Sequence, residues 1–385
     1  MERQSREAVI GGMLALVVAM GIGRFAFTPA LAYMQLDLGL SDAQGGQLAS
    51  LNYAGYLLGA LGAAAVPTGS RRIPFLASLL ISVTATALMA AGTDPLMWNI
   101  LRFASGTASA FLFVLASGIA LDSIRGNSRG NGLLFSGVGT GIALTGILAP
   151  VGYALGGWSG TWLTYGFAGL LLSIPAAVLL KEPEIPHRTL VFGRTRTIPL
   201  HVLMISYFCG GLGYIVTGTF IVVFVERTTT VPGMGSVVWT FVGLAAAPSC
   251  ILWARLGQRW GLSAALVAAF LILSVGVVLP ALSSSIPVFL LSALLYGGTF
   301  MGIVLLTMSL GKLTMPENSG RAVGLLTASF GVGQILGPWL AGHAAERFGS
   351  FTLPLLGAGV VTAIGGLLLA LTAAGHPGPS ETGKF

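Results

Sequence analysis

The sequence predicts an all-α integral membrane protein with twelve transmembrane helices, arranged as two six-helix bundles related by pseudo-two-fold symmetry. Of its 385 residues, 55% are hydrophobic and only 8% are charged, whereas soluble domains carry roughly 25% charged residues. The mean hydropathy is +0.88. Residues 130–180 and 260–311 contain no Asp, Glu, Lys or Arg, and each stretch is long enough for two helices of about 20 residues.

Apolar windows between charged and turn residues give the individual spans. In the first half they cover 8–34, 44–66, 73–92, 96–121, 131–156 and 160–180, and in the second half 199–225, 235–254, 262–281, 286–311, 322–344 and 352–374. The longest polar link separates the sixth span from the seventh. We therefore expect an N-terminal bundle over 1–181, a cytoplasmic linker over 182–198, a C-terminal bundle over 199–375 and a cytoplasmic tail over 376–385.

The orientation follows from the basic residues in the links. If the N-terminus is cytoplasmic, the opposite side holds only Arg227 and Arg347. The cytoplasmic segments then hold Arg3, Arg6, Arg71, Arg72, Arg125, Arg129, Lys181, Arg188, Arg194, Arg196, Arg255, Arg259, Lys312, Arg321 and Lys384. This division follows the positive-inside rule and requires an even number of spans. We expect a multi-pass protein of a bacterial cell inner (plasma) membrane with both termini in the cytoplasm.

The two halves repeat one another in sequence. The segment RGNGLL at 129–134 is echoed by RAVGLL at 321–326, about half the chain later. Gly-Val-Gly follows at 137–139 and again at 331–333, and Asn-Ser precedes the two copies at 127–128 and 318–319. Matches in register at this distance indicate a duplicated six-helix unit, which is the arrangement of a rocking transporter.

These features resemble the major facilitator superfamily over nearly the whole chain. The links 69–71 and 257–259 resemble degenerate copies of its cytoplasmic loop motif, and both lack the Asp of that motif. Arg102 with Gly106 resembles the arginine-containing motif of the fourth helix. The fifth span resembles the glycine-rich motif of antiporters through Gly137, Gly146, Pro150, Gly152, Gly156 and Gly157, with Ala149-Pro150 in place of Gly-Pro.

A narrower resemblance lies in the first two spans. The segments GIGRFAFTP at 21–29 and LNYAGYLLG at 51–59 are similar to the YbfB/YjiJ-type branch of the superfamily. This resemblance implies a transporter fold and leaves the substrate open.

Two arginines, Arg24 and Arg102, lie inside expected spans. Their helix positions place both roughly 5–10 Å to the outer side of the bilayer midplane. An ionised side chain inside a bilayer costs at least about 2.5–3.5 kcal/mol on insertion scales, so two of them without an accompanying carboxylate indicate an anionic substrate. Helices one and four of the superfamily fold both line the central cavity, and a guanidinium group can bind a carboxylate through two hydrogen bonds.

A structural interpretation of the same arginines stays open. Arg102 would then hydrogen-bond backbone carbonyls of the first helix and stiffen the bundle, and Arg24 would extend to lipid phosphates.

Further polar or aromatic residues fall near the midplane of other spans. We expect Asn52, Tyr53, Tyr56, Tyr214, Tyr296, Thr299 and Gln334 to join the two arginines in a substrate-binding site, because small-molecule sites combine aromatic walls with a few polar groups. Packing and hydrogen bonds between helices are the alternative role for each of them.

Catalytic and cofactor chemistry finds no support in the sequence. No Asp, Glu or His lies near the middle of an expected span, which disfavours a membrane-embedded enzyme. Cys209 and Cys250 have no CxxC spacing and no neighbouring His, so we expect no metal and no cofactor. The net charge of +7 is spread singly or in pairs over short links, which argues against nucleic acid as a partner. The expected partners are the lipid bilayer and a small molecule, and the expected state is a monomer.

We therefore predict a carrier that moves a small organic anion, expected to be a carboxylate, by alternating access. The missing buried acid favours anion exchange, facilitated passage or a proton that travels on the substrate. One alternative is an exporter of hydrophobic or cationic drugs by proton antiport, which the antiporter-like glycines support. Another is a signalling receptor with a transporter fold.

Overall fold

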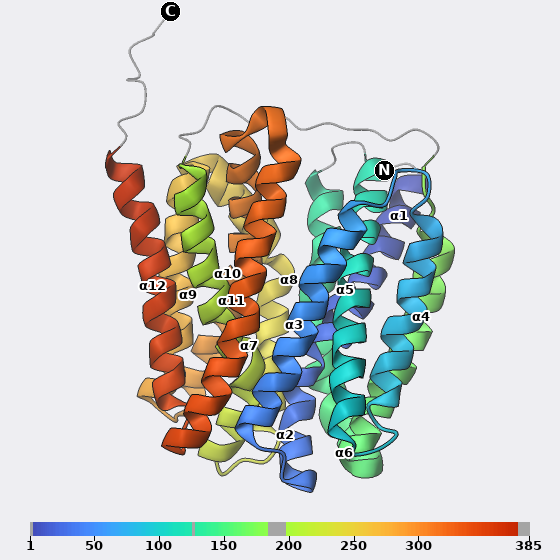
Figure 1. The fold of residues 1–385 in the computed structure, drawn as a ribbon, viewed down its shortest axis with the longest axis vertical. Helices are drawn as coiled ribbons and strands as arrows, with labels where there is room; N and C mark the ends of the chain where they lie inside the picture. The colour runs from blue at the N-terminus through green and yellow to red at the C-terminus, as the bar shows by residue number, and fades with distance from the viewer. Residues whose placement is uncertain (1–2, 125–127, 184–197, 376–385) are drawn as a thin grey trace, which may run out of the picture.

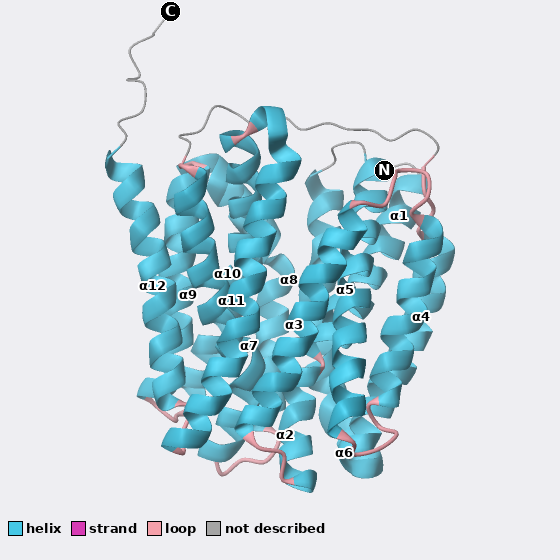
Figure 2. Cartoon of the chain, in the orientation of Figure 1, coloured by secondary structure: helices cyan, strands magenta, loops and turns pink. Residues whose placement is uncertain are grey.

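The computed structural model describes residues 3–124, 128–183 and 198–375, and every regular element in these ranges is a helix (Figure 2). Most of the expected linker, residues 184–197, and the expected tail, residues 376–385, lie outside the described residues. The bundle boundaries proposed from the sequence stay a prediction.

The first half of the chain begins with three consecutive helical segments, α1 (Arg3–Leu16), the π-helical η1 (Val17–Phe25) and α2 (Phe27–Leu38). They are followed by α3 (Asp42–Ala64), α4 (Arg72–Leu88), α5 (Pro95–Ile124) and α6 (Ser128–Leu179). The helix α6 is interrupted at Gly156 and Gly157, where Gly157 has φ +64°. This left-handed backbone suits glycine, and it lies between the two spans expected at 131–156 and 160–180.

The second half contains α7 (Leu200–Thr228), α8 (Met234–Trp260), α9 (Leu262–Leu282) and α10 (Ile286–Thr314). A short 3₁₀ turn, η2 (Pro316–Asn318), leads into α11 (Ser319–Phe348), and α12 (Thr352–Gly375) completes it. Polar or glycine residues mark the ends: Gly349 takes φ +69° after α11, and Ser41 closes a capping box with Gln44 at the start of α3. The helix ends agree with the expected spans to within several residues.

In the described part of the chain, nine helices are long and apolar enough to cross a membrane. The first of these nine spans α1, η1 and α2 together, and α6 with its two arms is counted as a single helix. The helix α4 is apolar but has only 17 residues. A count of twelve crossings adds α3, α4 and the second arm of α6 to these nine, and it stays a prediction.

The helices form two bundles that lie side by side (Figure 1), α1–α6 in one and α7–α12 in the other. The bundles meet where α3 packs on α11 and α6 packs on α8. Small residues allow this approach: a Cβ on Gly46 would lie 2.3 Å from the Pro338 carbonyl oxygen, and one on Gly139 would lie 2.1 Å from the Ala247 nitrogen. Such close backbone contact is the usual way in which helices associate in lipid.

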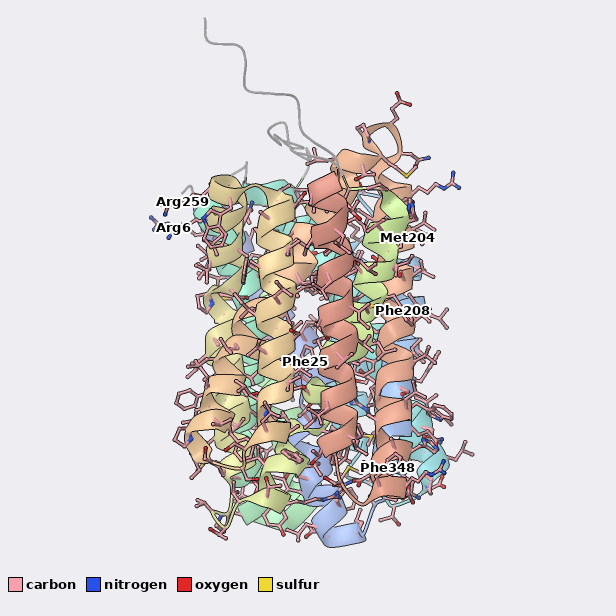
Figure 3. All side chains as sticks on the ribbon, turned by 90° about the vertical axis from the view of Figure 1, so that its left-hand side faces the viewer. Arg6, Phe25, Met204, Phe208, Arg259 and Phe348 are labelled. Carbon is pink, nitrogen blue, oxygen red and sulfur yellow. The ribbon has the colours of Figure 1, made fainter. Side chains whose placement is uncertain are left out.

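The start of α1 and the end of α12 lie at the same end of the molecule (Figure 1). We call this the terminal end, and the opposite one the distal end. Figure 3 labels Arg6 and Arg259 at the terminal end, Phe348 at the distal end and Phe25 between them.

Candidate functional site

The π-helical segment η1 carries Arg24 at the boundary between the two bundles. All nine residues of η1 are buried. A Cβ on Gly21 would lie 2.5 Å from the Gly141 Cα in α6, so glycine is needed for this close approach of the two helices. Single π-turns inside α-helices are frequent at functional sites because they redirect side chains.

The Arg24 side chain is 3% exposed, and aromatic rings surround its guanidinium group. Its Cζ lies 4.2 Å from the ring centre of Tyr56, 4.8 Å from that of Tyr53 and 5.2 Å from that of Phe25. Cation–π contacts of this kind contribute about 0.5–2 kcal/mol each. The rings lower the cost of burying the charge without neutralising it.

The second bundle reaches Arg24 through Tyr214 of α7. The Arg24 Nη2 donates a 3.4 Å hydrogen bond to the Tyr214 hydroxyl, and Gln334 Nε2 of α11 donates to the same oxygen. The Tyr214 ring stacks on those of Phe330, Phe300 and Tyr296 at centroid distances of 5.3, 5.8 and 6.3 Å. This aromatic set holds Tyr214 against the first bundle.

The Arg24 guanidinium is incompletely satisfied. Its Nε is buried without a hydrogen-bond partner, which costs about 1–3 kcal/mol for a buried polar group and more for a charged one. Among the described residues, no carboxylate forms a salt bridge with Arg24 or Arg102. A buried cation with spare donors and no acid is suited to receive an anion.

Arg102 and Asn52 have different surroundings, inside the first bundle. Arg102 is 2% exposed, its Cζ lies 4.4 Å from the ring centre of Phe27, and its Nη2 donates to the Arg24 carbonyl oxygen at 3.4 Å. Asn52 Nδ2 donates to the Arg102 carbonyl at 2.9 Å, and Ser105 Oγ donates to the Gly23 carbonyl at 2.6 Å. These bonds join α3, α5 and η1, which is the structural role that the sequence left open for Arg102.

The structure thus brings Arg24, Tyr53, Tyr56, Tyr214 and Gln334 together directly, and Tyr296 through its stacking on Tyr214. Thr299 is buried and donates to carbonyls of its own helix, Leu295 and Tyr296. Its contribution to a substrate site stays a prediction.

Sequence reasoning missed the aromatic partners Phe25, Phe300 and Phe330. Two of them carried a usable signal: Phe300 follows Tyr296 by four residues, and Phe330 precedes Gln334 by four. Residues at this spacing share one face of a helix, so each phenylalanine extends a face that already held an expected site residue.

The hydrogen bonds that the structure describes between the bundles lie at the level of Arg24 or nearer the distal end. Tyr53 and Thr219 share a 3.4 Å hydroxyl contact, and Thr28 Oγ1 donates to the Gly218 carbonyl. Toward the distal surface, Ser50 Oγ donates to the Ile335 carbonyl at 2.7 Å.

An ion pair closes the distal surface. Arg227 donates to both Asp42 oxygens, at 2.8 and 2.9 Å, and to Gln35 Oε1 at 3.1 Å. Beside it, the Glu346 carboxylate accepts from the Ser41 hydroxyl and from the Ala43 N–H, each at 3.3 Å. We call the Asp42–Arg227 and Ser41–Glu346 contacts the distal latch. The described state is therefore closed at the distal end.

At the terminal end, the link after α3 makes an ion-pair network although it lacks the Asp of the loop motif. Arg71 pairs with Glu182 through Nε at 2.6 Å and with Asp122 through Nη2 at 2.9 Å. Burial raises the pKa of the Glu182 carboxyl, but hydrogen bonds from the Arg71 side chain and from the Gly69 and Arg71 N–H groups outweigh it, and the net pKa is lowered. Acids from the ends of α5 and α6 thus take the place of the missing Asp within the first bundle.

Comparisons with known proteins agree with this architecture. Residues 16–370 match the family described as "Uncharacterised MFS-type transporter YbfB". Among curated proteins, no sequence matches significantly.

Among solved structures, a mutant of the nucleoside transporter NupG superposes with a TM-score of 0.76 at 13% identity, covering 96% of this chain and 100% of that one. Another structure of NupG gives a TM-score of 0.73 at 14% identity, covering 96% and 99%. At this identity the likeness concerns the fold alone, whereas the family match covers most of the sequence. The chain belongs to the YbfB-type family of major facilitator superfamily transporters.

Proposed function

We propose that this transporter moves a small organic anion, with a carboxylate as the expected charged group, across a bacterial inner membrane. The observation that carries the proposal is the Arg24 guanidinium, which is 3% exposed, lies between the two bundles and has no carboxylate partner among the described residues. An anion would take up its spare donors and neutralise its charge.

The position of Arg24 also supports alternating access. Arg24 belongs to the first bundle and bonds to Tyr214 of the second, so a ligand that displaces this long bond would change the contact between them. The distal latch is closed in this state. Opening toward the distal end requires breaking it, which matches a rocking motion of two bundles around a central site.

A ligand screen on purified protein tests the proposal. Sodium benzoate, hexanoate and succinate represent organic anions, adenosine represents the nucleoside class named for the structural neighbours, and tetraphenylphosphonium represents a hydrophobic cation. We expect at least one of the anions to raise the melting temperature, and neither adenosine nor the cation to do so. Stabilisation by tetraphenylphosphonium alone would favour the drug-exporter alternative.

Counterflow into liposomes then separates transport from binding. Liposomes loaded with the stabilising anion should accumulate the same labelled anion through the reconstituted protein, and an uncoupler should leave this exchange intact because no buried acid was found in the expected spans. Loss of exchange under the uncoupler would contradict an uncoupled anion exchanger.

A further inference from the structure

Tyr214, which accepts a hydrogen bond from Arg24, belongs to a continuous stack of aromatic rings in the second bundle. Tyr207 stacks on Phe330 at 4.1 Å and 17°, Phe330 on Tyr214 at 5.3 Å and 13°, and Tyr214 on Phe300 at 5.8 Å and 12°. The rings lie nearly parallel and face one another, so this column presents their edges as an apolar surface, which we call the aromatic wall. Tyr214, within the column, accepts the hydrogen bond from Arg24.

Several aromatic residues on the terminal side of this wall are partly exposed. Tyr53 and Gln334 are buried, whereas Tyr56 and Phe330, about one turn nearer the terminal end on the same helices, remain partly exposed. Phe208 of α7 is also partly exposed and lies between the terminal end and the level of Phe25 (Figure 3). A ligand that enters between the bundles from the terminal end would pass the level of these rings before it reaches the guanidinium.

Only one of the two buried arginines is placed to receive charge there. The Nε of Arg102, like that of Arg24, is buried without a hydrogen-bond partner. The Arg102 guanidinium, however, packs on Phe27 and donates to a backbone carbonyl of its own bundle, whereas that of Arg24 donates to Tyr214 of the second bundle. The described site therefore offers one guanidinium, and the neighbouring Tyr53, Tyr56, Tyr214 and Gln334 are uncharged. A second carboxylate on the ligand would be buried without a cation, which is costly.

We propose that the substrate is an aromatic monocarboxylate, bound with its carboxylate on Arg24 and its ring against the edges of the Phe330–Tyr214 stack. This inference rests on the proposed function and narrows it in two respects, ligand charge and ligand shape. A ligand ring that meets these edges in an edge-to-face contact uses the aromatic wall, and one carboxylate matches one guanidinium.

The test compares probes that differ in one property each, using equilibrium binding to the full-length protein in nanodiscs. Benzoate is the reference, benzamide removes its charge, phthalate adds a second carboxylate, and hexanoate replaces the ring by an alkyl chain. We expect benzoate to bind at least tenfold more tightly than each of the other three. Arg24→Gln should weaken benzoate binding at least tenfold.

A second variant separates ring recognition from charge recognition. Phe330→Leu keeps an apolar side chain but removes the stacked ring. It should weaken the binding of benzoate by about three- to tenfold and leave the affinity for hexanoate unchanged. Phe348→Leu is the matched control, because Phe348 lies at the distal end and is 57% exposed (Figure 3). It should change neither affinity. Phe330→Leu also preserves the test if Arg24→Gln yields no folded protein.

The possible failures are distinct. Binding of hexanoate or succinate that depends on Arg24 and equals or exceeds that of benzoate would overturn the aromatic inference and leave the organic-anion proposal standing. The absence of Arg24-dependent binding for every anion tested would overturn both.

Discussion

The arginines that join the two bundles differ in their contacts from the arginines inside the first bundle. Between the bundles, Arg24 makes one 3.4 Å hydrogen bond to Tyr214, and the Arg227 side chain of the distal latch is 47% exposed. Inside the first bundle, Arg102 packs on Phe27 and bonds to backbone, and Arg71 is held at 2.6 Å by a Glu182 side chain that is 11% exposed.

The difference follows from what each set of contacts must do. A carrier that alternates between two states separates its bundles at one end in each half of the cycle, so the exposed ion pair of the distal latch must be able to break. Contacts inside a bundle persist through the cycle and can be short and buried. We therefore predict a role in substrate recognition for Arg24, which donates to the second bundle, and a role in stability for Arg102, which packs and bonds within its own bundle.

The largest expected effect separates the two arginines by binding. Arg24→Gln should weaken the binding of the anion found in the ligand screen by roughly ten- to hundredfold. The reason is that charge-assisted hydrogen bonds contribute about 1.5–3 kcal/mol. Arg24→Lys should restore only part of the affinity, since an ammonium cannot form the two-pronged contact of a guanidinium. Isothermal titration of both variants measures this, and unchanged affinity in Arg24→Gln would refute the anion site.

Arg102→Gln should affect stability more than binding. The change removes the contact with Phe27 and the bond to the Arg24 carbonyl, so we expect a loss of about 1–3 kcal/mol, seen as a lower melting temperature. The affinity of the folded fraction should stay within about twofold of the parent. The opposite pattern, a large loss of affinity at unchanged melting temperature, would support the role in substrate binding that the sequence suggested for Arg102.

The sequence predicted the fold well because a bilayer imposes strong rules on length and hydropathy. Each expected span, from 8–34 to 352–374, coincides with described helical segments. Several residues expected near the midplane also lie together around Arg24, since polar and aromatic side chains in mid-span are rare enough to stand out. Their role in substrate binding stays a prediction.

Side-chain direction could not be read in the same way. Whether Arg102 faces a cavity or Phe27 depends on the rotation of α5 about its axis, and the π-helical turn at 17–25 shifts the register of the residues after it. Neither quantity is visible in an almost uniformly apolar helix. Phe300 and Phe330 were missed because one phenylalanine among many apolar residues carries no positional signal by itself.

A smaller effect is expected at the distal latch. Asp42→Asn weakens the pair with Arg227, and because exposed pairs contribute about 0.2–1 kcal/mol, the distal-open population should rise by at most about fivefold. A cysteine replacing Thr219, in a background with Cys209 and Cys250 replaced by serine, reports this by its rate of reaction with a membrane-impermeant maleimide.

Asp37→Asn is the matched control for the latch. Asp37 also lies at the distal end, but its carboxylate accepts from the Tyr153 hydroxyl and the Trp158 N–H at 2.9 Å each, all within the first bundle. Its loss should leave the labelling rate unchanged. Equal acceleration by both variants would mean that the latch does not separate the two states.

The smallest expected effect is a pH dependence inside the first bundle. Because the pKa of Glu182 is lowered in the folded protein by Arg71 and two backbone N–H groups, its contribution to stability is fully present above its unfolded pKa of about 4.3 and is lost as the pH falls through the folded value. Glu182→Gln should therefore lower the melting temperature at pH 7, and the difference in melting temperature from the parent should narrow below pH ~4.

Glu317→Gln, at an exposed position in η2, is the control and should show no such narrowing. A constant difference between Glu182→Gln and the parent across this range would mean that the carboxylate charge adds nothing to the network, and that shape and packing alone hold the link after α3.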